Sequence, residues 1–290
     1  MAYRATPAMA LTAALALSVA GCAGSQAGPA GGRWGAATRS VAGPAADSGT
    51  KTSAPDPVAE ACGPPSAPGR LTTIRASDGV RLAAIEAGAG RRGVVLIPEL
   101  GAKGKCGWWD YGAYLAAHGF RVLLFDHRCT GVSSCPSAAT APTGLMSDIN
   151  GAVSRLHQEG ATTTVLLGAS QGGAEGLITA TLPQHVVTGV AVLSADELST
   201  PLAAGPYPAT AMAAAARLRL PVLFAVAAGD PYVSVRQTRQ LFGDAGSRRK
   251  QLVVLGPDHG HGWDLVAAQP DGSRPAFSRT LLAFLRSATS

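Results

Sequence analysis

The sequence predicts an α/β fold in which a mostly parallel central sheet carries helices on both faces. Short apolar runs of the kind that form buried strands occur at residues 164–167, 221–228 and 252–255. Stretches with helical spacing separate these runs, and this alternation is typical of α/β proteins. The composition agrees, because 47% of the residues are hydrophobic and only 14% are charged.

The first 21 residues have the features of a signal peptide. Arg4 precedes an apolar stretch over residues 9–20 that is too short to span a bilayer comfortably. Its end, Val-Ala-Gly-Cys at residues 19–22, resembles a bacterial lipoprotein signal, in which the cysteine becomes the lipidated first residue. We therefore expect removal of residues 1–21 and a lipid on Cys22, at the outer face of the cell membrane. The alternative is a plain secretory signal with an accidental cysteine.

The mature chain is expected to consist of a lipid-anchored linker, residues 22–61, and one globular domain, residues 62–290. Gly, Ala, Ser, Pro and Thr dominate residues 23–61, so this segment carries too little apolar surface to fold. A flexible chain of this length has a root-mean-square reach of roughly 35 Å. Such a linker would hold the domain away from the membrane surface.

Within the domain, periodicity predicts the elements in order. Two alternating segments around Asp78-Gly79 predict a hairpin over residues 71–86. Strands are expected at residues 94–97, 121–125, 164–167, 190–193, 221–228 and 252–255, and helices at 108–117, 145–159, 174–180, 209–218 and 233–242. The interval from Asp196 to Arg219 is short, which predicts that no large cap domain is present.

The sequence Gly168-Ala169-Ser170-Gln171-Gly172 lies between a predicted buried strand and a predicted helix. A serine on a sharp strand-to-helix turn is held with its hydroxyl exposed above the sheet. Small residues are needed two positions before and after it, because the strand and helix backbones approach closely there. The helix N-terminus also directs free N–H groups at the reacting oxygen. Ser170 is therefore the candidate nucleophile, although a structural glycine turn would have the same pattern.

A base and an orienting carboxylate are expected after the serine in chain order. Asp230 follows the strand at 221–228, and Asp196-Glu197 follows the strand at 190–193 as the second candidate. Asp230 would also suit the N-cap of the helix at 233–242. His259 and His261 both lie in the loop after the strand at 252–255. A serine hydroxyl is a weak nucleophile unless a neutral imidazole takes its proton and a carboxylate orients that imidazole.

These residues together resemble the α/β-hydrolase superfamily over roughly residues 70 to 288. The resemblance is carried by the serine pentapeptide, by Gly229-Asp230 and by the sequence His-Gly-Trp-Asp-Leu at residues 261–265. The stretch at residues 125–133 is similar to the family's Asp-x-Arg-Gly-x-Gly-x-Ser loop, with Cys129 in place of the first glycine. The resemblance implies a triad of Ser170, Asp230 and His261, and it favours His261 over His259.

The family tends to carry a His-Gly pair after its third strand, but Pro98-Glu99-Leu100-Gly101 occupies that place here. This loop supplies one N–H to the oxyanion in the family. The resemblance therefore implies that the backbone N–H groups of Gln171 and Leu100 form the oxyanion hole, with Glu99 as the alternative to Leu100. A Glu99 carboxylate would be unfavourable there unless it points outward.

Several aromatic residues and histidines lie near predicted strand ends. Candidate pocket walls are Trp108, Trp109, Trp263 and Tyr232, although packing between helices and sheet is an equal explanation. The other four histidines, His118, His127, His157 and His185, are expected at the surface, and His127 could line the pocket.

Four cysteines remain once Cys22 is lipidated, and an even number in an oxidising compartment suggests two disulfides. Cys129 with Cys135 would close a short loop, and Cys62 with Cys106 would join the end of the linker to the loop after the third strand. Pairing of Cys106 with Cys129 or Cys135 is the alternative.

The function that follows is hydrolysis of a small-molecule carboxylic ester through an acyl-enzyme, without a cofactor. The alternatives are a peptidase or dienelactone-type hydrolase on the same fold, and a surface-tethered binding protein without activity. The formal charge of +6 is scattered along the chain, so no nucleic-acid partner is expected. The cysteine and histidine spacings predict no metal site.

Overall fold

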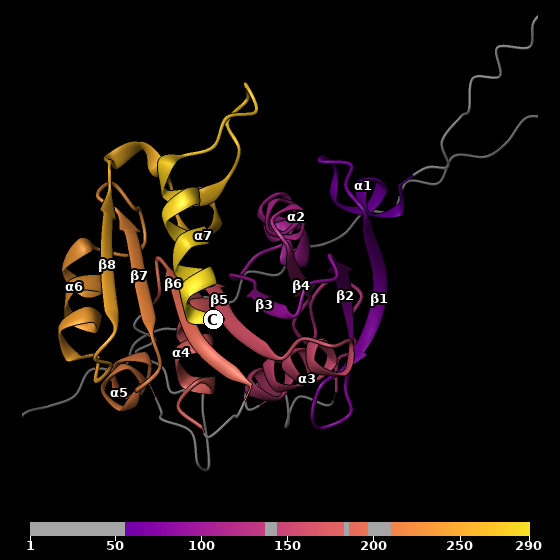
Figure 1. Cartoon of the computed structure of the whole chain (residues 1–290), viewed down its shortest axis with the longest axis horizontal. Coiled ribbons are helices and arrows are strands. Elements are labelled where there is room, and N and C mark those ends of the chain that lie inside the picture. The colour runs from indigo at the N-terminus through magenta and orange to yellow at the C-terminus, as the bar shows by residue number, and fades with distance from the viewer. Residues whose placement is uncertain (1–55, 137–143, 183–185, 197–209) are drawn as a thin grey trace, which may run out of the picture. The chain divides into compact units, whose positions relative to one another are not determined.

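The computed structural model describes residues 56–136, 144–182, 186–196 and 210–290, which all belong to one compact unit. This part of the chain contains an eight-stranded sheet with helices on both faces (Figure 1), which confirms the predicted fold class. The strands are β1 (Gly69–Arg75), β2 (Arg81–Ala87), β3 (Arg92–Ile97), β4 (Phe120–Phe125), β5 (Thr163–Ala169), β6 (Val187–Leu193), β7 (Val222–Ala227) and β8 (Lys250–Leu255).

The strand order is β1-β2-β4-β3-β5-β6-β7-β8. The hairpin β1–β2 and the pair β2–β4 are antiparallel, and all other pairs are parallel. β3 lies between β4 and β5, with Val94 opposite Val122 on one side and Val165 on the other. The direction of winding reverses at β3, and such a reversal opens a crevice at the carboxyl ends of the strands.

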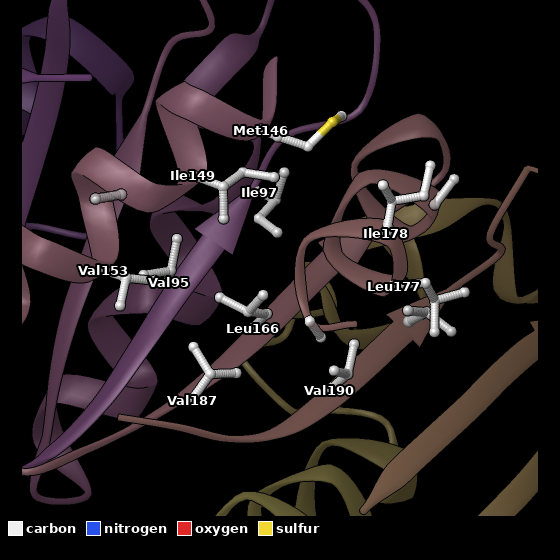
Figure 2. Packing of buried hydrophobic residues seen from close by; sticks show 14 of the residues in the cluster. Val95, Ile97, Met146, Ile149, Val153, Leu166, Leu177, Ile178, Val187 and Val190 are labelled. Carbon is white, nitrogen blue, oxygen red and sulfur yellow. The ribbon is translucent and has the colours of Figure 1, made fainter. Parts of the chain in front are cut away.

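Each face of the sheet has its own apolar core. One core lies under α3 (Leu145–Gln158), α4 (Gln171–Thr179), α5 (Ala211–Arg217) and α6 (Val235–Asp244). In Figure 2, Val95 and Ile97 of β3 lie close to Ile149 and Val153 of α3 in this core. The other core lies under α2 (Trp109–Ala117) and α7 (Ala276–Ala288), with α1 (Pro57–Cys62) and the short 3₁₀ helices η1 (Gly104–Trp108) and η4 (Gly262–Val266) at its margin.

The structure adds three features to the sequence prediction. The C-terminal helix α7 was not expected, and α1 lies within the last residues assigned to the linker, so helical structure begins at residue 57. The N-cap of α6 is Ser234, which forms a capping box with Gln237; Asp230 does not cap this helix. Of the segment expected to lack a large cap, residues 197–209 lie outside the described residues, as do the signal peptide and residues 22–55.

Two disulfides join the pairs that the sequence favoured, Cys62–Cys106 and Cys129–Cys135. Cys129 has a φ of 64°, a backbone conformation that glycine adopts readily and other residues rarely do. That conformation gives a physical reason for a glycine at this position in the loop it resembles. Among the residues described, no helix combines the length and apolar character needed to cross a bilayer.

Candidate active site

Ser170 is the single residue between β5 and α4, and its backbone is strained. Its φ of 51° and ψ of −122° lie outside the regions that non-glycine residues normally adopt. The N–H of Ser170 donates to the carbonyl of Leu193 at 2.9 Å, and its own carbonyl accepts from the N–H of Gly173 at 3.0 Å. The turn is therefore held from the strand side and from the helix side, which fixes the direction of the Ser170 side chain.

The glycines around Ser170 are required by close backbone contacts. A Cβ on Gly168 would collide with the backbone of Gly172, and a Cβ on Gly172 would collide with the carbonyl oxygen of Pro98. The second contact brings the start of α4 against the loop that follows β3. The N–H of Gln171, the first residue of α4, is one of the amides that a helix leaves without an internal partner.

His261 is oriented by Asp230. Its Nδ1 lies 2.9 Å from both carboxylate oxygens of Asp230, and the Asp230 side chain is fully shielded from solvent. The two residues come from loops after neighbouring parallel strands, β7 and β8. The Nδ1–H···carboxylate contact leaves Nε2 as the nitrogen that can accept a proton.

The Asp230 carboxylate is stabilised as an anion. Burial by itself raises its pKa, but hydrogen bonds from the Ser194 hydroxyl, from the N–H groups of Val233 and Tyr232, and from His261 together lower it below its usual value. Val233 and Tyr232 each donate to Asp230 Oδ1 at 2.9 Å. Asp230 therefore stays ionised at neutral pH and can stabilise an imidazolium on His261.

Ser194 joins the acid to the base, and sequence reasoning missed it. Its Oγ accepts the N–H of Gly262 at 3.1 Å, while its hydroxyl donates to Asp230. Ser194 is fully buried at the end of β6 and has a φ of 52°. The adjoining Asp196, the second candidate for the acid, is exposed at the surface, and Glu197 lies outside the described residues.

His259 does not face the triad. It lines a separate surface pocket of about 500 Å³ together with Asp264 and Arg274. The Nδ1 contacts with Asp230 belong to His261, as the family-like motif indicated.

A small apolar cavity adjoins the expected oxyanion hole. It has a volume of about 270 Å³ and is lined by residues of the β3–η1 loop, the β4–α3 loop and the start of α4. Leu100 and Gln171, the two residues whose backbone N–H groups were expected to bind the oxyanion, both line this cavity. A pocket near the lower end of the usual ligand-site range accommodates a small group.

The Glu99 side chain points inward. A loop that donates an N–H to the oxyanion would favour the outward orientation, which keeps the carboxylate away from the oxyanion. One of its carboxylate oxygens lies where a Cβ on Gly262 would stand, next to His261. Burial and the nearby charges of Asp264 and Asp230 raise its pKa to about 7, against the lowering effects of Lys103 and a hydrogen bond from the Trp263 backbone. Glu99 can therefore be neutral or ionised near pH 7.

A second charged cluster adjoins the same cavity and includes His127. His127 lines this cavity, as the sequence allowed, but it is not at the surface where it was first expected. His127 is buried, with Nε2 3.0 Å from Glu175 and Nδ1 3.7 Å from Asp148. Burial would lower its pKa, but Glu175 and Asp148 raise it to about 10, so His127 is a cation at neutral pH. Glu175 also accepts a hydrogen bond from the side-chain amide of Gln171, with Nε2 at 2.6 Å from Oε1. A lone carboxylate on an otherwise apolar helix was the signal that could have identified Glu175.

The expected aromatic walls divide into two kinds. Trp108 and Trp109 are fully buried, and Trp263 is nearly so and packs edge-on against Trp108. Tyr232 is exposed, and its ring lies 4.8 Å from the His261 ring. Tyr232 is therefore the aromatic residue that borders the triad, and the tryptophans are packing residues. Across the ranges that the structure describes, no group of three or more His, Cys, Asp or Glu residues could hold a metal ion.

Comparison with known proteins identifies the family and agrees with the fold. The family described as alpha/beta hydrolase fold matches residues 93–269, which is more than half of the chain, and the chain belongs to this family. A search of curated proteins finds no match.

Solved structures of similar fold include an esterase from Pyrococcus furiosus, with a TM-score of 0.62, 15% identity, and coverage of 78% of this chain and 94% of the esterase. A monoacylglycerol lipase from Paleococcus ferrophilus has a TM-score of 0.55, 18% identity, and coverage of 71% of this chain and 99% of the lipase. An esterase from Rhodococcus has a TM-score of 0.55, 19% identity, and coverage of 75% and 99%. At these identities the likeness is one of fold.

Proposed function

We propose that this protein is a serine hydrolase that cleaves carboxylic esters, with Ser170 as nucleophile, His261 as base and Asp230 as the orienting acid. The observation that carries the proposal is the pairing of a strained Ser170 backbone with a His261 ring held at 2.9 Å by Asp230. Strained serines at strand-to-helix turns and carboxylate-bound histidines are the two halves of a nucleophilic site.

In the proposed reaction, His261 Nε2 takes the proton of Ser170 Oγ as this oxygen attacks the acyl carbonyl. The oxyanion that forms accepts hydrogen bonds from the N–H groups of Gln171 and Leu100. His261 then returns the proton to the leaving alcohol, and the acyl group stays on Ser170. Water attacks this acyl-enzyme by the same route and releases the acid.

The substrate is proposed to be an ester with a small acyl group. The apolar cavity of about 270 Å³ beside Gln171 would hold that group. The names of the similar structures, two esterases and a monoacylglycerol lipase, support an ester substrate, and the size of the acyl group is inferred from the cavity alone. A panel of p-nitrophenyl esters from two to sixteen carbons should therefore give the highest kcat/KM at the short end. Faster cleavage of peptide or dienelactone substrates would instead identify a peptidase or a dienelactone-type hydrolase that uses the same catalytic residues.

We also propose that the protein is exported and held at the outer face of the cell membrane by lipid on Cys22. The lipoprotein-like sequence at residues 19–22 supports this, and a diacylglyceryl group would supply the two chains that stable retention needs. Mass spectrometry of the mature N-terminus tests it. An unmodified cysteine, or a mature start other than Cys22, would leave a freely secreted enzyme.

Labelling by a fluorophosphonate probe tests the chemistry directly. The wild-type protein should be labelled at Ser170, and Ser170→Ala should lose both labelling and ester hydrolysis while keeping its unfolding midpoint. Ser154→Ala is the matched control, because Ser154 is exposed on α3, away from the site. Undiminished turnover by Ser170→Ala would refute the assignment, and absence of labelling in a folded wild type would favour a binding protein.

A further inference from the structure

Three large apolar side chains are far more exposed than any others in the described part of the chain. Their exposed fractions are 71% for Leu100, 85% for Val132 and 77% for Tyr232. The next two are Leu71 and Val254, at 41% and 40%. Leu71 lies on β1 and Val254 on β8, the two edge strands, whereas the first three lie in loops.

The three loop residues, here called the apolar rim, belong to loops that border the candidate active site. Tyr232 stacks edge-on against His261, and the Glu99 carboxylate next to Leu100 lies against Gly262. On the other side, Leu100 lines the same cavity as Thr130, two residues before Val132. The apolar rim therefore runs from the base, past the oxyanion loop, to the tip of the loop closed by Cys129 and Cys135.

The N-terminal segment joins the fold at this same edge of the sheet. The Cys62–Cys106 disulfide attaches the end of α1 to η1, which follows the oxyanion loop. The two residues that flank Cys106 in the sequence, Lys105 and Gly107, contact residues in the loops that follow the carboxyl ends of the strands. Lys105 binds the carboxylate of Asp126 just after β4, and Gly107 packs against the ring of Trp263. A chain leading from residue 56 to a membrane would therefore start beside the site entrance.

We propose that the apolar rim rests on the phospholipid bilayer that carries the anchor, so that the active-site entrance faces the lipid. This inference depends on the proposed lipid on Cys22, because the anchor keeps a bilayer within reach of the linker. A flexible linker sets only the greatest distance from the membrane, so contact of the apolar rim with the bilayer would replace the separation expected from the sequence. Lys103, exposed three residues after Leu100, adds a positive charge that suits anionic headgroups. Tyr232 combines an apolar ring with a polar tip, as is favoured at membrane interfaces. The enzyme would then draw its ester from the membrane surface.

Tryptophan quenching tests the contact without using catalysis. The lipidated full-length chain is reconstituted into vesicles of phosphatidylcholine and phosphatidylglycerol, with or without brominated phosphatidylcholine. Val132→Trp should show extra fluorescence that brominated lipid quenches, and Leu71→Trp, the control on β1, should not. Equal quenching at both positions, or none at either, would overturn the proposal, as would a chain that fails to float with the vesicles. Quenching replaced by concentration-dependent self-association would identify a second copy as the occupant.

Kinetics with a matched pair of variants gives the second test. Val132→Ser should hydrolyse a water-soluble ester as the wild type does, but should hydrolyse a vesicle-borne ester about tenfold more slowly, the effect of losing one valine-sized apolar contact. Leu71→Ser should match the wild type on both substrates. Equal rates for the two variants on vesicles would overturn the inference. Quenching does not depend on catalysis, so it can also be measured in a Ser170→Ala background. If the wild type docks in this assay but hydrolyses neither ester, the proposed function alone is refuted.

Discussion

Two histidines near the carboxyl ends of the strands, His261 and His127, both contact carboxylates, but their surroundings differ. His261 contacts one carboxylate, that of Asp230, and keeps part of its ring accessible to solvent. His127 is buried between Glu175 and Asp148, and these two charges raise its pKa to about 10.

The difference shows that the number of neighbouring carboxylates and the access to solvent determine whether a histidine can exchange a proton. A single buried carboxylate orients the His261 ring and leaves its second nitrogen able to take and release a proton. Two carboxylates and full burial keep His127 protonated at neutral pH, so it acts as a fixed cation that holds α4 against the β4–α3 loop. Substitution of His261 should therefore affect mainly activity, and substitution of His127 should affect mainly stability.

The largest expected effect is on catalysis through His261. His261→Ala should lower kcat at least ~10³-fold, because the hydroxyl of Ser170 then keeps its proton. Steady-state kinetics with a short-chain ester measures this. His259→Ala is the control and should remain close to wild type; if the two variants exchange effects, His259 is the base.

The second effect is on stability through His127. His127→Ala should reduce the free energy of unfolding by about 3–5 kcal/mol, since it leaves the buried Glu175 carboxylate without its cation. Urea unfolding measures the loss, and His261→Ala should stay within about 1 kcal/mol of wild type. Addition of Glu175→Gln should restore much of the loss, because it removes the stranded charge. If His127→Ala alone is as stable as the wild type, the His127–Glu175 pair is not charged.

A smaller effect is expected from Ser194, which connects the acid to the loop of the base. Ser194→Ala removes one hydrogen bond to the ionised Asp230, and should lower kcat about tenfold with little change in KM. It should also leave Gly262 N–H without its acceptor. The comparison of kcat with KM on one ester measures this, and a change confined to KM would place Ser194 in substrate binding instead.

The smallest effect is a change in pH dependence through Glu99. With a pKa of about 7, Glu99 is neutral below that pH and an anion above it, and the anion disfavours a second negative charge on the oxyanion. The wild-type rate should fall about threefold from pH 7 to 9, and Glu99→Gln should remove this fall.

Asp264→Asn sharpens the Glu99 test. The charge of Asp264 helps to raise the pKa of Glu99, so this variant should move the alkaline decline to lower pH. A wild-type profile that is flat above pH 7, and identical in Glu99→Gln, would show that Glu99 does not affect the reaction.

Local sequence predicted the residues at strand ends well. The strand before Ser170, the strand before Asp230 and the loop around His261 each have a clear pattern within about ten residues, and the structure contains each of these elements. The Asp230–His261 contact then follows from the adjacency of parallel strands β7 and β8.

Residues that depend on contacts across the fold were not predictable. Ser194 gains its role only because β6 ends beside Gly262, and His127 becomes a buried cation only because α4 brings Glu175 to it. Helix α7 is a different case, because its buried Phe277, Leu281 and Leu285 have helical spacing and local sequence could have predicted it. Glu99 points inward because Gly262, without a Cβ and with a φ of 57°, leaves room for its carboxylate.

The Cys62–Cys106 disulfide has a mechanical consequence. A pulling force on the chain before residue 57 reaches the fold at Cys62 and passes through the disulfide into η1, next to the start of α2. Residues 63–68 and the edge strand β1 lie outside that path, so tension cannot unzip β1 from β2 one hydrogen bond at a time. The bond thus transfers load from an exposed hairpin to a segment packed against both the sheet and Trp263.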